Sequence, residues 1–203
     1  MPRNRREEIL LAALDVFGER GYTGASIAAV AERVGLSQQG VLHYFPTKDR
    51  LLAEVLRLRD ERGLDVIALG NSGGAITLDT ISAIIDYNRE RRGIVQSFTV
   101  LSAESVLDDH PAAGFFRDRY SESRTWLADV VRAECGSDLP GGVTPEQAAP
   151  LLLAVMDGLQ QQWLLSPDDV DMPGLFRAFL ALLRANVTPP AAGDGRDGEA
   201  SRG

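Results

Sequence analysis

Three side chains that can hydrogen-bond to bases lie close together near residue 40: Gln38, Gln39 and His43. A glutamine amide can pair with N6 and N7 of adenine, and an imidazole can bond a guanine acceptor or a phosphate. If Val41 is set at zero and each residue adds ~100°, Gln39 falls at about 160° and His43 at about 200°. Both therefore lie opposite Val41, and this outward face favours contact with the major groove of DNA.

Two short crossed helices are needed to hold these side chains outward. Gly35 suits the turn between them, which requires a positive φ, and Ala31 is small enough for a close crossing. We expect Tyr44 and Phe45 to face the core with Val41, because both fall within about 60° of it. The apolar residues at the expected helix contact are Ile27, Val30, Ala31, Val34, Leu36 and Val41.

Several residues at expected helix starts suit a phosphate. Ser26, Ser37 and Thr47 stand at N-cap positions, and Lys48 follows directly. The free N–H groups and the dipole of a helix N-terminus favour an anion, although simple capping explains the hydroxyls equally well. Gly40 costs about 1 kcal/mol in a helix relative to Ala, which reflects either close approach of DNA or an indifferent surface site.

The 203-residue chain has a net charge of −8, which by itself argues against a nucleic-acid partner. Residues 1–62 hold ten Lys/Arg and nine Asp/Glu, whereas residues 63–203 hold eleven and twenty. The acidity therefore lies outside the candidate DNA-binding segment. Arg3, Arg5 and Arg6 form either a basic arm that reaches DNA or a solvated terminus.

Cys135 is the single cysteine, so an internal disulfide framework is excluded. The sequence has no signal-peptide pattern and no run of about 18 apolar residues, and we expect a cytoplasmic protein with no membrane contact.

Apolar residues recur at helical spacing, and no window alternates with the period of a strand, so we expect an all-α fold. Gly21 should end the first helix, and the fourth should bury Leu51, Leu52, Val55 and either Leu58 or Arg59. Residues 70–74 read as a linker, and the tail from Thr188 should be disordered. The expected helices span about 4–20, 27–34, 38–44, 48–62, 76–91, 93–108, 112–135, 145–165 and 172–187.

Residues 5–52 resemble the DNA-binding domain of the tetracycline repressor (TetR) family. The resemblance rests on Ile9-Leu10, Ala13, the run from Phe17 to Tyr22, Gly35-Leu36-Ser37 and the run His43-Tyr44-Phe45-Pro46-Thr47-Lys48. It implies a homodimer with a helix-turn-helix domain at 1–47, a helical ligand-sensing and dimerisation domain at 48–187, and a tail at 188–203.

The resemblance also implies roles for single residues. Gln38, Gln39 and His43 would contact bases, and Ser37, Tyr44 and Lys48 would contact phosphates. The position of Leu42 is commonly a tyrosine that bonds the DNA backbone. Leu42 cannot donate that bond, so a thymine-methyl or sugar contact, or none, is expected there.

The later helices carry more apolar residues than one narrow core face requires. We expect the helices near 145–165 and 172–187 to pack against those of a second copy. An effector pocket should be mostly apolar with few polar groups, although most candidates are equally explained as core. These candidates are Tyr87, Phe98, Leu101, Ser102, Phe116, Tyr120, Trp126, Met156, Gln160 and Trp163.

These features together predict a sequence-specific transcriptional regulator, a repressor released from a palindromic operator by a small, largely apolar effector. No cofactor and no metal site is expected. The alternatives are a helical interaction module whose helix-turn-helix does not bind DNA, and an all-helical enzyme, which the lack of a catalytic constellation argues against.

Overall fold

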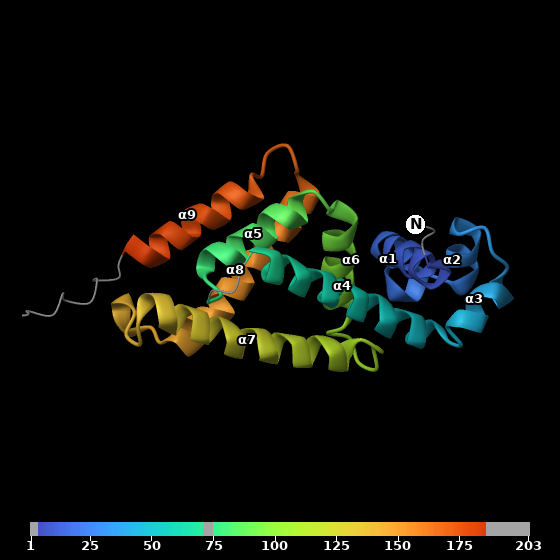
Figure 1. The fold of residues 1–203 in the computed structure, drawn as a ribbon, viewed down its shortest axis with the longest axis horizontal. Helices are drawn as coiled ribbons and strands as arrows, with labels where there is room; N and C mark the ends of the chain where they lie inside the picture. The colour runs from blue at the N-terminus through green and yellow to red at the C-terminus, as the bar shows by residue number, and fades with distance from the viewer. Residues whose placement is uncertain (1–3, 71–74, 186–203) are drawn as a thin grey trace, which may run out of the picture.

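The computed structural model describes residues 4–70 and 75–185, and the described residues contain helices and no strand (Figure 1). Expectations for residues 71–74 and for the tail at 188–203 lie outside these residues. The α-helices are α1 (Arg5–Gly24), α2 (Ile27–Arg33), α3 (Gln38–Tyr44), α4 (Lys48–Gly70), α5 (Leu78–Arg89), α6 (Arg92–Glu104), α7 (Ala113–Cys135), α8 (Pro145–Leu165) and α9 (Met172–Ala185).

The expected helices are confirmed, with differences at their ends. Helix α4 continues to Gly70, and α6 stops at Glu104 rather than at residue 108. Gly21 has a φ of 67° and interrupts the helical geometry of α1, which resumes as a short turn up to Gly24. Within the described residues, no helix is both long enough and apolar enough to cross a membrane.

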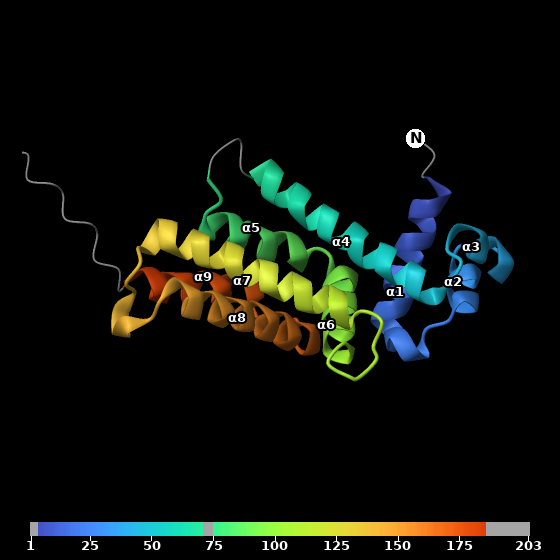
Figure 2. The same ribbon diagram turned by 90° about the horizontal axis from the view of Figure 1, so that it is seen from below.

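Two groups of buried apolar side chains hold the chain together. The first consists of residues from α1, α2, α3 and α4, together with Phe98 and Leu101 of α6 and Phe116 of α7. The second lies mainly among α5, α7, α8 and α9. Helices α7 and α8 pack against each other and are seen side by side in Figure 2, and α4 leads from α3 to the C-terminal helices (Figures 1 and 2). The first group includes residues on both sides of position 47, so apolar packing is continuous across the predicted domain boundary.

The closest contact between the N-terminal helices and the rest of the chain is made by α1 and α6. A Cβ atom on Gly18 would lie 3.1 Å from the Cα atom of Ser97, so glycine favours the close approach of the two backbones. Even a methyl group at position 18 would require a shift of a few tenths of an ångström. The Gln96 side chain donates a hydrogen bond of 3.1 Å to the Gly18 carbonyl. One turn further along α1, the Tyr22 amide donates to the Glu104 carboxylate at 2.6 Å.

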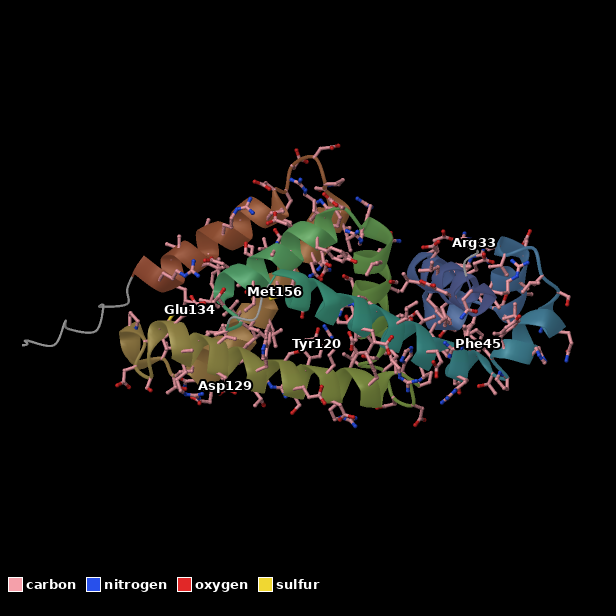
Figure 3. The ribbon with its side chains drawn as sticks, viewed as in Figure 1. Arg33, Phe45, Tyr120, Asp129, Glu134 and Met156 are labelled. Atoms are coloured by element: carbon pink, nitrogen blue, oxygen red, sulfur yellow. The ribbon has the colours of Figure 1, made fainter. Side chains whose placement is uncertain are left out.

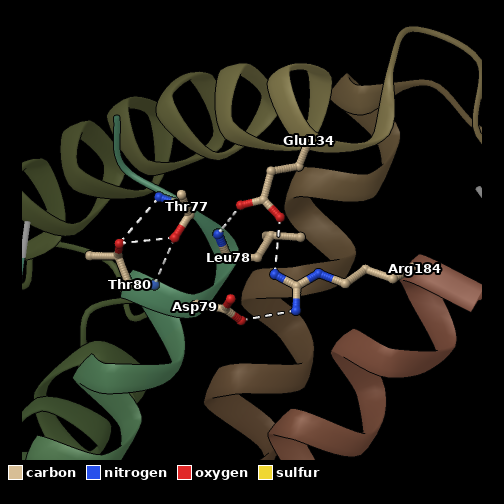
Figure 4. Close-up of polar contacts among 6 residues, drawn as sticks. All are labelled: Thr77, Leu78, Asp79, Thr80, Glu134 and Arg184. Carbon is tan, nitrogen blue, oxygen red and sulfur yellow. Dashed lines mark hydrogen bonds and ion pairs between the residues drawn. The ribbon is translucent and has the colours of Figure 1, made fainter. Parts of the chain in front are cut away.

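A polar network fixes the last described helix to the C-terminal bundle (Figure 4). Glu134 of α7 accepts a hydrogen bond of 2.5 Å from the Leu78 amide at the start of α5. Arg184 of α9 pairs with Glu134 at 3.0 Å and with Asp79 at 2.9 Å. Thr77 caps α5 by accepting a hydrogen bond from the amide of Thr80. These contacts orient α9 and thereby the outer face of α8 and α9.

Replacing Gly18 by Val should destabilise the protein, because the new side chain meets the backbone of Ser97. We expect a loss of about 1–3 kcal/mol in the free energy of unfolding, measured by urea denaturation. Gly114→Val is the matched control, since a Cβ on Gly114 has nothing within 4 Å. Equal stability of the two variants would contradict the role assigned to the α1–α6 contact.

Candidate nucleic-acid interface

Helix α3 is fixed from one side and open on the other. Val41 is 0% exposed and anchors the helix in the first apolar group. Gln38, Gln39 and His43 are all exposed, as their helical positions predicted. Gly35, with a φ of 65°, makes the turn that joins α2 to α3. The arrangement offers two amides and one imidazole on a short, well-anchored helix.

The expected inward direction of Tyr44 is wrong, whereas that of Phe45 is confirmed. Phe45, labelled in Figure 3, is 1% exposed. The guanidinium carbon of Arg6 lies 5.1 Å from the centre of the Phe45 ring. Tyr44 is 42% exposed and contacts the ring of His43 edge to face. Helix α3 ends at Tyr44, so the residue after it leaves the helix and turns into the core. Tyr44 is therefore accessible to a phosphate.

Leu42 is half-buried and packs against the first apolar group. Packing within the protein is therefore enough to explain why residue 42 is apolar, without any contact to DNA.

Three hydroxyl side chains cap the helices around α3. Ser26 accepts a hydrogen bond from the Ala29 amide and Ser37 accepts one from the Gly40 amide, each at 3.1 Å. Thr47 accepts from the Arg50 amide at 3.0 Å at the start of α4. All three hydroxyl residues are exposed, so each O–H can still donate to an anion while its oxygen caps the helix.

Lys48 is held at the junction between the helix-turn-helix and α6. Its Nζ atom lies 4.2 Å from the centre of the Tyr22 ring, and burial lowers the pKa of Lys48. The Tyr22 hydroxyl donates to Asp49, and burial together with this bond raises the pKa of Tyr22 to about 12. The Tyr22 amide also bonds Glu104 of α6. Lys48 therefore belongs to the same group of interacting residues as the contact between α1 and α6.

The arginines of the expected N-terminal arm are paired within the protein where the structure describes them. Arg5 pairs with Glu8 at 2.7 Å, and Arg6 pairs with Glu54 at 2.6 Å. Arg3 lies outside the described residues. Arg6 therefore ties α1 to α4.

The expected pocket residues do not gather around one cavity. Phe98 and Ser102 line a cavity of about 140 Å³ between α6 and α8, with Thr99, Ala103, Asp157 and Gln161. The hydroxyl of Tyr120, which is labelled on α7 in Figure 3, donates to Asp157 at 2.7 Å. Burial raises the pKa values of both groups. Leu101, Phe116, Gln160 and Trp163 are buried in the apolar groups or beside them, and Tyr87, Trp126 and Met156 are half-buried.

Two charged residues near this cavity were not among the pocket candidates. Asp157 resembles an ordinary surface carboxylate in the sequence, and only the fold brings it to Tyr120. Arg59, one of two alternatives for the inward face of α4, has a side chain only 15% exposed. Its guanidinium carbon lies 4.0 Å from the centre of the Phe98 ring. The helical position of Arg59 was the only sequence signal for its burial.

The chain matches two family profiles that together span most of its length. Residues 9–55 match "Bacterial regulatory proteins, tetR family", and residues 78–187 match "BetI-type transcriptional repressor, C-terminal". The HTH-type transcriptional regulator BetI 1 of Chromohalobacter salexigens is 30% identical over 173 residues, which are 83% of each chain. The HTH-type transcriptional regulator RutR of Escherichia coli is 42% identical over 53 residues, 26% of this chain and 25% of RutR.

Solved structures show the same fold over nearly the whole chain. A transcriptional regulator from Rhodococcus sp. Rha1 aligns with a TM-score of 0.73 and 26% identity, covering 91% of this chain and 99% of its own. A transcriptional regulator from Saccharomonospora viridis, solved in complex with choline, aligns with a TM-score of 0.74 and 19% identity, covering 91% and 98%. These relatives are regulators rather than enzymes, in agreement with the sequence prediction. The chain belongs to the TetR family and is a helix-turn-helix transcriptional regulator with a DNA-binding N-terminal region and a ligand-binding C-terminal domain.

Proposed function

We propose that α3 enters the major groove of an operator and that Gln38, Gln39 and His43 contact its base edges. The observation that carries the proposal is their common exposure on a helix whose opposite face is anchored by the fully buried Val41. None of the three is an arginine, so the common bidentate contact from arginine to guanine is absent from this face. Adenine-containing positions should therefore contribute much of the specificity.

The phosphate contacts come from the ends of the surrounding helices. Ser26, Ser37 and Thr47 donate from exposed hydroxyls at helix starts, where the dipole also favours an anion. The exposed Tyr44 donates its hydroxyl, and Lys48 supplies a charge from the junction with α6. Leu42 contributes only apolar contact to a sugar or a thymine methyl. These groups position α3 without reading sequence.

The protein acts as a homodimer through α8 and α9. Leu151 of α8 is 58% exposed and Leu175 of α9 is 46% exposed, although the helices also bury Leu152 and Phe176 in the second apolar group. Leu165 at the end of α8 is 77% exposed. Large aliphatic side chains on the outer face of two packed helices favour association with a second copy. Two copies of α3 would then meet successive major grooves of a palindromic operator.

The effector site lies in the C-terminal domain, proposed as residues 48–187, at the cavity lined by Phe98, Ser102 and Asp157. Its size suits a small molecule that donates a hydrogen bond to the half-buried carboxylate of Asp157. Choline is a natural first probe, because the regulator from Saccharomonospora viridis was solved with it. The cavity borders the last turn of α6, whose Glu104 bonds Tyr22 of α1. An occupant that shifts this turn would change the spacing of the two α3 helices and release the repressor from its operator.

Selection of bound sequences from a random DNA pool should enrich a palindrome. Gln39→Ala and His43→Ala should each relax the preference at one position per half-site, by about 1–3 kcal/mol of discrimination. Lys48→Ala should instead weaken all sequences alike and lower the salt dependence by about one phosphate contact. Recovery of no palindrome would favour an interaction module whose helix-turn-helix does not bind DNA.

Gly40→Ala should stabilise the protein and weaken operator binding. A Cβ on Gly40 would lie 3.4 Å from the Ser37 hydroxyl, an ordinary contact, and alanine gains about 1 kcal/mol of helix propensity. Thermal unfolding and gel shifts measure the two effects. Gly114→Ala on α7 is the control for stability without an effect on DNA. Unchanged operator affinity would show that the glycine does not serve close approach of the DNA.

Leu151→Glu should convert the dimer to monomers in sedimentation velocity, because it places a charge in the apolar contact. Operator affinity should fall with the loss of the second half-site. Ala28→Glu, at an exposed site on α2, is the control for sedimentation and should remain dimeric. A dimeric Leu151→Glu variant would exclude this face of α8 from the interface.

A further inference from the structure

The cavity between α6 and α8 is the smaller of two hollows that adjoin the same pair of arginines. Its volume is about 140 Å³, and a hollow of about 340 Å³ lies between α4 and the start of α7. Phe98 and Asp157 line the smaller cavity, whereas Asp60 lines the larger hollow. Arg59 of α4 and Arg119 of α7 interact with all three of these residues.

The charges beside the smaller cavity balance one another. Arg59 and Arg119 both bond Oδ1 of Asp60, and the charges of both arginines act on Asp157. Two cations therefore face two carboxylates, and the Tyr120 hydroxyl also donates to Asp157. When Asp157 is ionised, the four charges cancel, and when it is protonated, a positive excess remains. In neither state does this group of residues leave a carboxylate without a partner.

Solvent screens these charges only weakly. The side chains of Arg59 and Arg119 are 15% and 29% exposed, and Asp157 is half-buried. Burial and then the charge of Arg119 lower the pKa of Arg59 to about 10, so Arg59 stays protonated at neutral pH. An ion that entered the cavity would lose hydration without finding an unpaired opposite charge.

The aromatic ring on the cavity wall already contacts two cations. The guanidinium carbons of Arg59 and Arg119 lie 4.0 and 5.1 Å from the centre of the Phe98 ring, both within the range of a cation–π interaction. A bound ammonium group would have to share this ring with them, and both guanidinium groups would repel it. The aromatic side chain therefore does not favour a cationic ligand here.

The other polar groups on the wall of the smaller cavity are uncharged. Ser102 donates to the Thr99 carbonyl at 3.1 Å, so its oxygen can still accept a hydrogen bond. The Gln161 amide can both donate and accept. Phe98 and Ala103 supply apolar contact. Such a lining suits a small apolar molecule with one hydroxyl or amide group.

We propose that the smaller cavity binds an uncharged molecule with a hydroxyl or amide group, and that Arg59 makes the cavity disfavour cations. Arg59 acts through Phe98 and Asp157, so it sets specificity from behind the cavity wall. This assignment rests on the proposed function, because the smaller cavity is the effector site named there. It adds the chemical class of the effector and the residue that determines it.

The test compares three probes by isothermal titration calorimetry on the DNA-free protein. Choline and 3,3-dimethyl-1-butanol share one shape and one hydroxyl group, and differ in the charged nitrogen that replaces a carbon. The third probe, 4,4-dimethylpentanoate, carries a carboxylate in place of the hydroxyl group. The alcohol should bind about tenfold more tightly than either ion, because an unpaired charge in weakly screened surroundings costs at least that factor.

Two variants of Arg59 separate its charge from its packing. Arg59→Met removes one cation, leaves Asp60 bonded to Arg119, and leaves a carboxylate in excess when Asp157 is ionised. Choline affinity should rise about tenfold in this variant, with little change for the alcohol. Arg59→Lys keeps the charge and should keep the preference of the wild type. A purely structural role of Arg59 would alter the affinities for choline and for the alcohol alike.

A second pair of variants locates the bound alcohol. Ser102→Phe should abolish its binding by filling the smaller cavity. Ala53→Phe, at an exposed site that lines the larger hollow, should leave it unchanged. The opposite result would place the ligand in the larger hollow and would overturn the proposal.

Equal or tighter binding of choline or of 4,4-dimethylpentanoate by the wild type would also overturn it. So would an unchanged choline affinity in Arg59→Met, or loss of the preference in Arg59→Lys. If no probe binds any of these proteins, the smaller cavity is not the effector site, and that part of the proposed function fails as well. A preference for choline would instead keep the effector site and remove only its assigned ligand class. The selection of DNA sequences uses no effector, so its outcome is independent of these results.

Discussion

The approach of α1 to α6 at Gly18 is the constraint on which the rest of the structure depends. Because no side chain on Gly18 separates it from Ser97, α1, which packs against the helix-turn-helix, rests directly on α6, which lines the smaller cavity. Gln96 and Glu104 add hydrogen bonds at either end of this contact. The apolar group built around it includes residues of α1, α3, α4, α6 and α7. A change in α6 therefore reaches α1 through backbone contact rather than through long side chains.

This constraint explains how an acidic protein can present a DNA-binding surface. Most of the described arginines near the N-terminus form salt bridges within the protein. Examples are Arg6 with Glu54 and Arg33 with Glu19. The groups that we propose for DNA contact are neutral donors on α3 and at helix starts, together with the charged Lys48. Affinity from such donors depends on their being held in place, since little long-range attraction guides the encounter. The packing of the buried Val41 in the first apolar group fixes α3 and supplies that positioning.

Much of the fold, and the exposure of the residues proposed to contact DNA, could be predicted from the sequence, because both follow local rules. The 3.6-residue period places Val41 inward and His43 outward, and Gly35 marks its turn directly. Tyr44 departs from this rule although it lies within α3: Phe45, the first residue after the helix, takes the place in the core, and Tyr44 is left exposed at the helix end. The cavities could not be predicted, because apolar spacing marks Phe116 and Phe98 alike as buried. Only the tertiary arrangement determines which of them borders an empty volume.

Gly21 has a consequence beyond the end of its own helix. Its positive φ is one reason for glycine, but the Glu104 carboxylate also occupies the space that any Cβ at this position would need. Residues 21 and 104 thus form one steric unit, although they lie in different parts of the chain. A side chain at position 21 would push the flexible Glu104 carboxylate aside, at the cost of its hydrogen bond to the Tyr22 amide. The glycine therefore preserves a polar contact between the DNA-binding and ligand-binding regions, in addition to making its own turn.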